Sequence, residues 1–192
     1  IFSRYDIAVL PQAFENCGFT ELEFPKQVSY ISPYSFCNCI NLVSIDLSHY
    51  DLTKLHAGIF ANCTNLKKVV FPERNKELCD EIFMGTGFQT ISLENTFSLG
   101  KAAFKNCHNL VTVNLSQTAI ENISESTFQN CYKLSTLVLP ETIISLGSYA
   151  LSMTNITCLI APKTMTKIDS HCFENTEINY VDAKGLSEIG DS

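Results

Sequence analysis

Nine cysteines and four histidines are the side chains of this 192-residue sequence that could bind metals, form disulfides or act as nucleophiles. Most of the cysteines recur at one position of a repeated sequence pattern, and Thr replaces Cys at that position in some copies. The sequence contains no CxxC pair, and no His stands at zinc-ligand spacing from a Cys. The pattern favours a ladder of buried free thiols that pack as small apolar side chains, with disulfides between neighbouring copies as the alternative. The ladder consists of Cys17, Cys39, Cys63, Cys107 and Cys131.

The other candidates for chemistry lie outside that ladder. Cys37 and Cys79 fall at other positions of the repeat and are the candidate reactive thiols, with Cys37 expected to be exposed and Cys39 buried. Each histidine falls at a different phase of the repeat, and the sequence contains neither a nucleophile elbow nor a glycine-rich phosphate loop. The sequence therefore predicts no catalytic, cofactor-binding or metal-binding residues, and a protein that is not an enzyme.

A large apolar residue that recurs every 21–24 residues defines the repeat. In six of the eight copies Asn stands two positions after this anchor, and Cys or Thr stands at the third position. Recurrence at this length is the signature of a solenoid. The anchors are Phe14, Phe36, Phe60, Phe83, Phe104, Phe128, Leu151 and Phe173.

Three apolar residues (the triplet) follow the Asn-Cys step of each copy and predict a short strand. In the four long copies they have the spacing of Leu110, Val113 and Leu115. The other four copies are one residue shorter before the triplet, and three of them carry Thr in place of Cys. Because the end of the triplet alternates with period two, each strand should bury one face. A unit this short cannot bury its apolar residues alone, so the copies must stack with parallel strands about 4.8 Å apart.

A second apolar pair and a tight turn complete each copy. The second member of the pair stands five residues before the next anchor, as Ile31 and Ile123 do. Small or β-branched residues before most anchors favour a helical or 3₁₀ turn on the back of the coil. The segments 73–77 and 94–98 depart from the pattern and predict irregular loops, the first of them charged.

Residues 1–192 are expected to form a single solenoid of about seven full repeats, with partial repeats at both ends. Phe2 lies 12 residues before Phe14, so the chain is expected to begin inside a strand. Neither end shows the polar capping unit that solenoids need for solubility. We therefore expect part of a longer array, whose open ends could also support self-association.

Composition excludes several classes of partner. The net charge of −7 argues against nucleic-acid binding, which requires a stripe of basic residues. The apolar runs are too short to span a membrane, and the first residues lack the features of a signal peptide. Four N-x-[ST] sequons would allow glycans if a eukaryote exports the protein; they begin at Asn62, Asn114, Asn122 and Asn155.

Residues that alternate with the buried triplet positions form the outer face of the predicted sheet. This face is acidic at its amino end and apolar towards its carboxyl end, where Pro140 and Pro162 stand beside it. Clustered exposed apolar side chains are typical of contact sites, and stacking against a neighbouring chain is the competing explanation. The candidate protein-binding residues are Glu21, Glu23, Asp46, Val138, Cys158, Ile160, Tyr180 and Asp182.

The repeat Ala-Phe-x-Asn-Cys-x-x-Leu-x-x-Ile-x-Leu-Pro, as in residues 103–107 and 134–140, resembles the BspA-like class of leucine-rich repeats over essentially the whole chain. The resemblance implies a right-handed leucine-rich-repeat solenoid of the α/β type, with a parallel β-sheet on the concave face and short helical or 3₁₀ turns and loops on the convex face. It also implies surface proteins of host-associated bacteria and parasitic protists, which are proposed to bind extracellular-matrix proteins or cells, and it brings no shared catalytic residues.

The sequence thus predicts a non-catalytic protein-binding module without cofactors. It is expected to be a cell-surface or secreted adhesion protein that contacts a host or matrix protein through its concave sheet. The alternative is an intracellular, cytoplasmic scaffold or regulatory protein with the same solenoid.

Overall fold

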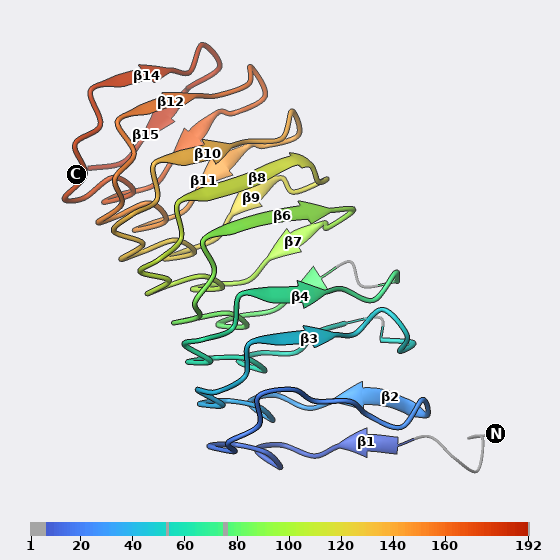
Figure 1. Cartoon of the computed structure of the whole chain (residues 1–192). Coiled ribbons are helices and arrows are strands. Elements are labelled where there is room, and N and C mark those ends of the chain that lie inside the picture. The colour runs from blue at the N-terminus through green and yellow to red at the C-terminus, as the bar shows by residue number, and fades with distance from the viewer. Residues whose placement is uncertain (1–6, 53, 75–76, 192) are drawn as a thin grey trace.

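The computed structural model describes residues 7–191 except 53 and 75–76, and shows a stack of coils that rises from β1 to β14 (Figure 1). Each coil is one copy of the repeat and contributes short parallel strands to two sides of the stack. The expected strand around Phe2 and part of the charged loop at 73–77 lie outside the described residues. The coil architecture therefore confirms a parallel β-solenoid.

The apolar triplets form the strands of one side, which we call the first sheet. Neighbouring coils pair in parallel with the repeat in register, as Ile45 with Val69 and Leu137 with Val113 show. Along each strand, buried residues alternate with residues that face outward, as the period-two pattern predicted and as β6 shows. The strands are β3 (Ser44–Asp46), β4 (Lys68–Val70), β6 (Thr90–Glu94), β8 (Thr112–Gln117), β10 (Thr136–Val138), β12 (Cys158–Ile160) and β14 (Tyr180–Asp182).

The second apolar pair forms a second parallel sheet, which the sequence patterns did not predict. Six of its strands, from β5 to β15, make one continuous ladder, and the bridge from Leu55 to Leu78 extends it to the preceding coil. Its buried row includes Leu99 and Ile123, which are register partners. The strands are β1 (Ile7–Val9), β2 (Val28–Ile31), β5 (Glu77–Leu78), β7 (Ser98–Leu99), β9 (Asn122–Ile123), β11 (Ser145–Leu146), β13 (Lys167–Ile168) and β15 (Glu188–Ile189).

The first sheet is interrupted where a short copy follows a long one. No ladder joins β4 to β6 or β10 to β12, and β6 and β12 are the strands of the short copies anchored on Phe83 and Leu151. Two consecutive short copies pair normally, as β12 and β14 do. A short copy followed by a long one pairs normally, as β6 and β8 do, so the first sheet divides into groups only where a long copy precedes a short one.

Two left-handed residues in each coil replace the predicted helical or 3₁₀ turn. The residues two before and two after each anchor have positive φ, as Tyr34 (56°) and Asn38 (60°) do around Phe36. Their geometry turns the backbone outward, so the N–H groups of Phe36 and Asn38 donate to the carbonyls of Ile59 and Ala61 in the next coil. None of the described residues is helical, and that part of the prediction was wrong. Asn suits the second position because it tolerates the left-handed region better than most residues.

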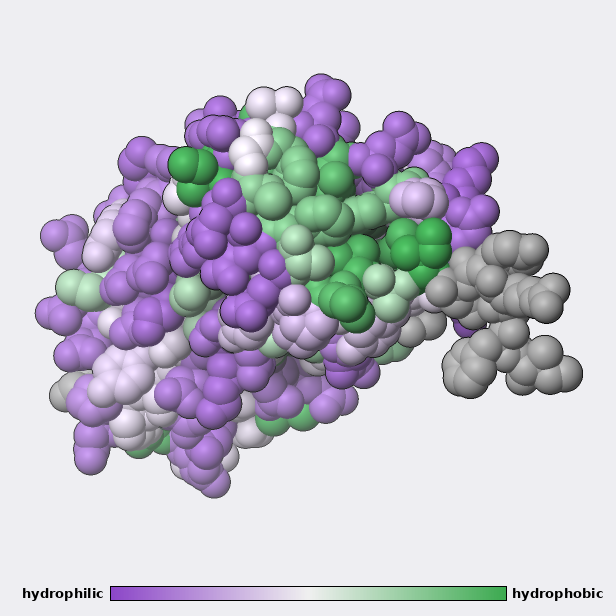
Figure 2. All heavy atoms as spheres, turned by 90° about the horizontal axis from the view of Figure 1, so that it is seen from below, coloured by the Kyte–Doolittle hydropathy of each residue, from purple (hydrophilic) through white to green (hydrophobic). Residues whose placement is uncertain are grey.

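The anchors form the centre of a continuous core. Successive phenylalanine rings stack from Phe14 to Phe128, with centroids 5.3–6.0 Å apart. Phe36 and Phe104 are fully buried, whereas Phe14 and Phe173, in the first and last coils, are half-buried. Figure 2 views the stack from the β1 end and shows hydrophobic side chains gathered there.

One row of asparagines is linked from coil to coil and then broken. The Asn130 Nδ2 atom donates to Asn106 Oδ1 at 2.8 Å. The Oδ1 atom of Asn130 is buried without a hydrogen-bond partner. In the next coil Met153 holds the equivalent position, with a φ of 56°. Met cannot donate the hydrogen bond that another Asn would, and it occupies a left-handed conformation that costs a side chain about 1–2 kcal/mol.

The substitution Met153→Asn should therefore stabilise the solenoid. A new carboxamide at this position would donate to Asn130 Oδ1, as Asn130 itself does to Asn106. Met153→Gly is the matched control, because it relieves the backbone without supplying a donor. We expect the free energy of unfolding of the Asn variant to exceed that of the Gly variant by about 1 kcal/mol in urea titrations. Equal stabilities would contradict the hydrogen-bonded row.

Candidate functional site

The outer face of β12 and β14 carries the apolar part of the predicted site. Ile160 is 71% exposed and Tyr180 is 54% exposed. The parallel register places Cys158 beside Tyr180 and Ile160 beside Asp182. All of these except the half-buried Asp182 are exposed, so the structure brings four of the predicted residues together on two paired strands.

Val138 lies on the same side of the stack but outside that pair of strands. It is 41% exposed and pairs with Asn114 on β8, across the interruption that separates β10 from β12. Pro140 is buried, so the expectation that it borders the patch was wrong, whereas Pro162 is half-buried. Pro140 accepts a turn hydrogen bond from the N–H of Ile143, and this turn tucks the ring into the coil.

A hollow lies at the exit loops of these strands. Its volume is about 420 Å³, and Leu139, Ile160 and Pro162 line its apolar part. Lys184 and Asp182 stand at its polar side and form an ion pair at 3.4 Å. The patch therefore continues into a depression that an apolar side chain of a partner can enter.

The predicted acidic residues gather at the other end of the face. Glu21, Glu23 and Asp46 line one hollow of about 550 Å³ and are exposed. Hydrogen bonds from Ser48 hold the pKa of Asp46 below its ordinary value. Glu21 and Glu23 do not lie in a strand. Beside them, the hydroxyl of Tyr50 accepts from the N–H of Phe24 and donates to its carbonyl, each at 2.9 Å.

The outward row of the second sheet is paired within the protein. Lys54 and Glu77, on neighbouring coils, form an ion pair at 2.9 Å. Further along the row, Ser145 donates to Asn122 at 2.6 Å. Side chains that bond across coils have less need of an external partner. The apolar residues of the first sheet have no such internal partner to cover them, which distinguishes the two faces.

The cysteine ladder is a set of buried donors. Cys39, Cys63, Cys107 and Cys131 each place Sγ 3.0–3.1 Å from the carbonyl oxygen of the anchor in a preceding coil. Thr86 bonds instead to the carbonyl of the anchor in its own coil, at 2.8 Å, as Thr154 and Thr176 do. Thiol and hydroxyl thus both bond an anchor carbonyl, the thiol that of the preceding coil and the hydroxyl that of its own coil.

The thiols expected to react are not placed for reaction. Cys37 is buried, contrary to the expectation, and this burial raises its pKa. Burial likewise raises the pKa of the half-buried Cys79, and it raises the pKa of Cys63 to about 12. All nine cysteines are free, and Cys158 is the exposed one.

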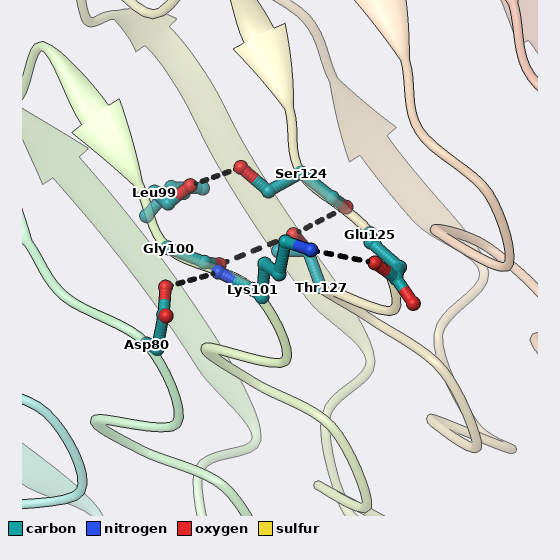
Figure 3. A network of polar contacts seen from close by, with 7 residues as sticks. All are labelled: Asp80, Leu99, Gly100, Lys101, Ser124, Glu125 and Thr127. Atoms are coloured by element: carbon teal, nitrogen blue, oxygen red, sulfur yellow. Dashed lines mark hydrogen bonds and ion pairs between the residues drawn. The ribbon is translucent and has the colours of Figure 1, made fainter.

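A polar network at the corner between the second sheet and the turns contains the residue types of a catalytic site (Figure 3). Ser124 Oγ donates to the carbonyl of Leu99 at 2.6 Å, so no base activates it. Lys101 pairs with Glu125 at 2.9 Å, which raises the pKa of Lys101 and lowers that of Glu125. Thr127 donates to the carbonyl of Ser124 at 2.8 Å. The N–H of Lys101 also donates to Asp80 Oδ1 at 2.7 Å, so the network ties three coils together and points to structure rather than catalysis.

The described part of the chain contains neither a metal-ligand cluster nor a membrane-spanning helix. No three His, Cys, Asp or Glu side chains in these residues are arranged to hold a metal ion. Among the same residues there is no helix with the length and hydrophobicity needed to cross a membrane.

The fold and its faces define a repeat protein of the parallel β-solenoid class. A model of the BspA type leucine rich repeat region matches in six copies over residues 7–98 and 76–192. The chain therefore belongs to the BspA-type leucine-rich-repeat family, a repeat family consistent with a protein-interaction module. No curated protein matches it by sequence.

Solved structures show the same fold at low sequence identity. A leucine-rich repeat protein from Bacteroides ovatus is 21% identical with a TM-score of 0.68, covering 95% of this chain and 60% of that one. One from Eubacterium ventriosum is 19% identical with a TM-score of 0.56, covering 90% and 63%. The T. pallidum leucine rich repeat protein is 18% identical with a TM-score of 0.53, covering 88% and 72%. This chain thus spans less than two thirds of the first two structures.

Thiol labelling tests the distribution of the cysteines. In the folded protein at neutral pH we expect Cys158 to react first with a thiol reagent, because it is exposed. Cys63 and Cys172, with pKa values raised to about 12 by burial, should react only after unfolding. Cys158→Ser should remove the fast phase. Fast labelling of Cys63 in the native state would contradict the buried ladder.

Removal of a corner hydroxyl tests the structural role of the network in Figure 3. Ser124→Ala leaves the carbonyl of Leu99 without this donor, and we expect a loss of about 1 kcal/mol in the free energy of unfolding. Ser170→Ala, at the half-buried corner of a later coil, is the control, because the Ser170 hydroxyl makes no hydrogen bond to the described residues, and it should cost less. An unchanged stability of Ser124→Ala would show that the hydrogen bond contributes little.

Proposed function

We propose that this chain is a non-catalytic protein-binding module of a cell-surface or secreted adhesion-type protein. Its partner is a protein, of the host-cell or extracellular-matrix class, and the contact surface is the outer face of the first sheet, expected from the sequence to be concave. One observation carries the proposal: Ile160 and Tyr180 expose apolar surface on paired strands beside a hollow. Desolvation of such side chains is a main source of affinity at protein interfaces.

The contrast between the two sheets supports this choice of face. Two outward pairs of the second sheet bond between coils, Lys54 with Glu77 and Ser145 with Asn122. The apolar cluster on β12 and β14 is instead open to solvent, and rigid strands hold it in place. A partner that covers Ile160 removes apolar surface from water without breaking an internal hydrogen bond.

Binding measurements with matched variants test the face. Ile160→Asp and Tyr180→Ala should each weaken binding to immobilised matrix proteins at least about tenfold, which corresponds to about 1.4 kcal/mol. Ile189→Asp is the control, because Ile189 has the same residue type and the same 71% exposure but lies on β15 of the second sheet. Wild-type affinity of both first-sheet variants, or an equal loss in Ile189→Asp, would exclude this surface.

Location is tested separately from binding. Antibodies against the chain should label intact, unpermeabilised source cells or detect the protein in their medium. Labelling only after permeabilisation would favour the alternative, an intracellular scaffold with the same solenoid.

A further inference from the structure

The four sequons of the chain occupy different environments in the solenoid. Asn62 is half-buried in a left-handed turn, and a Cβ on Gly85 of the next coil would lie 2.6 Å from its Oδ1 atom. Asn114 is half-buried in β8, and its Oδ1 accepts from the N–H of Ser116 at 3.0 Å. The carboxamide of Asn62 is therefore packed against the next coil, whereas that of Asn114 stands on the outer face of the first sheet and is held there by the backbone of Ser116.

Asn122 is exposed but takes part in the second sheet. Its Oδ1 atom accepts from the Ser145 hydroxyl of the next coil at 2.6 Å. The hydroxyl residue of its sequon, Ser124, donates to the carbonyl of Leu99. This sequon is thus held on both sides by contacts between coils.

Asn155 combines the features that the other three lack. It lies exposed in the turn before β12, and its carboxamide makes no hydrogen bond to another described residue. The N–H of Asn155 donates to the carbonyl of Leu134, so the backbone of the turn is anchored while the side chain is free. The sequon continues with Ile156, which is buried, and Thr157, which is exposed. A substituent on Asn155 can therefore extend into solvent without opening the core.

We infer that Asn155 is a site of N-linked glycosylation, an inference that rests on the exported location in the proposed function and on a eukaryotic secretory pathway. In the transfer, the Nδ2 atom of Asn155 forms a bond to C1 of an oligosaccharide carried by a lipid pyrophosphate. The bond from C1 to the phosphate oxygen breaks, the lipid pyrophosphate leaves, and the transferase accepts the amide proton. No oxidant or reductant is required.

The position of Asn155 connects the glycan to the binding face. It lies three residues before Cys158, at the entry end of β12, whereas the hollow beside Ile160 lies at the exit end. An oligosaccharide at the entry end would cover that border of the first sheet. The protein partner would then approach from the side of the exit loops.

The test expresses the whole chain behind a cleavable signal sequence in yeast. Peptides are mapped by mass spectrometry after N-glycosidase treatment, both in the lumenal fraction and in the medium. We expect the Asn155 peptide to be converted to Asp by the glycosidase, and one mobility shift to be lost in Asn155→Gln and in Thr157→Ala. Thr157→Ser keeps the sequon and should keep the shift, which separates loss of the acceptor from misfolding. Asn122→Gln should leave the modification of Asn155 unchanged.

An unmodified Asn155 peptide in both fractions would overturn the inference. Binding by the glycan-free chain made in bacteria is measured in parallel with the Ile160→Asp variant. If that chain binds its partner through Ile160 while Asn155 stays unmodified in yeast, the glycosylation site fails and the proposed function stands. If Asn155 is modified and Ile160→Asp binds normally, the binding face fails and the modification site stands.

Discussion

Hydrogen bonding between the backbones of neighbouring coils is the interaction on which the whole structure depends. It runs along both sheets and through the turns, where residues such as Phe36 and Asn38 donate to the next coil. The two left-handed residues around each anchor make the turn ladder possible, because they direct N–H groups along the stack rather than back into a helix. Each coil therefore contributes to a core that it could not form alone.

The backbone hydrogen bonds between coils determine which positions of the repeat are structural and which are free for function. Anchors, triplets, thiols and left-handed asparagines are constrained by the contacts between coils, and the corner network around Ser124 reinforces them. The residues between them face solvent and differ from coil to coil. On the second sheet some of these side chains bond to one another, whereas Ile160 on β12 and Tyr180 on β14 remain open to solvent. A binding function fits these two strands because a partner that covers Ile160 competes with no side-chain hydrogen bond of that residue.

The two length classes link sequence detail to the shape of the face. Short copies lack one residue before the triplet, and their Thr reaches the carbonyl of their own anchor instead of that of the preceding coil. The same change interrupts the first sheet before β6 and β12. It isolates Val138 from Ile160 in the ladder, although both stand in one column of the repeat. The apolar patch is therefore centred on the last two first-sheet strands.

The sequence by itself determined the repeat, the register of the first sheet and the burial of Phe36, Cys39 and their equivalents, because these depend on periodic apolar spacing. It also predicted the exposure of Ile160 and Tyr180, since alternation in a strand decides which face a residue takes. Only the tertiary structure decided the form of the turns, the second sheet, the burial of Cys37 and the break between β10 and β12. These depend on hydrogen bonds and packing between coils, and a linear pattern does not record which neighbour lies alongside.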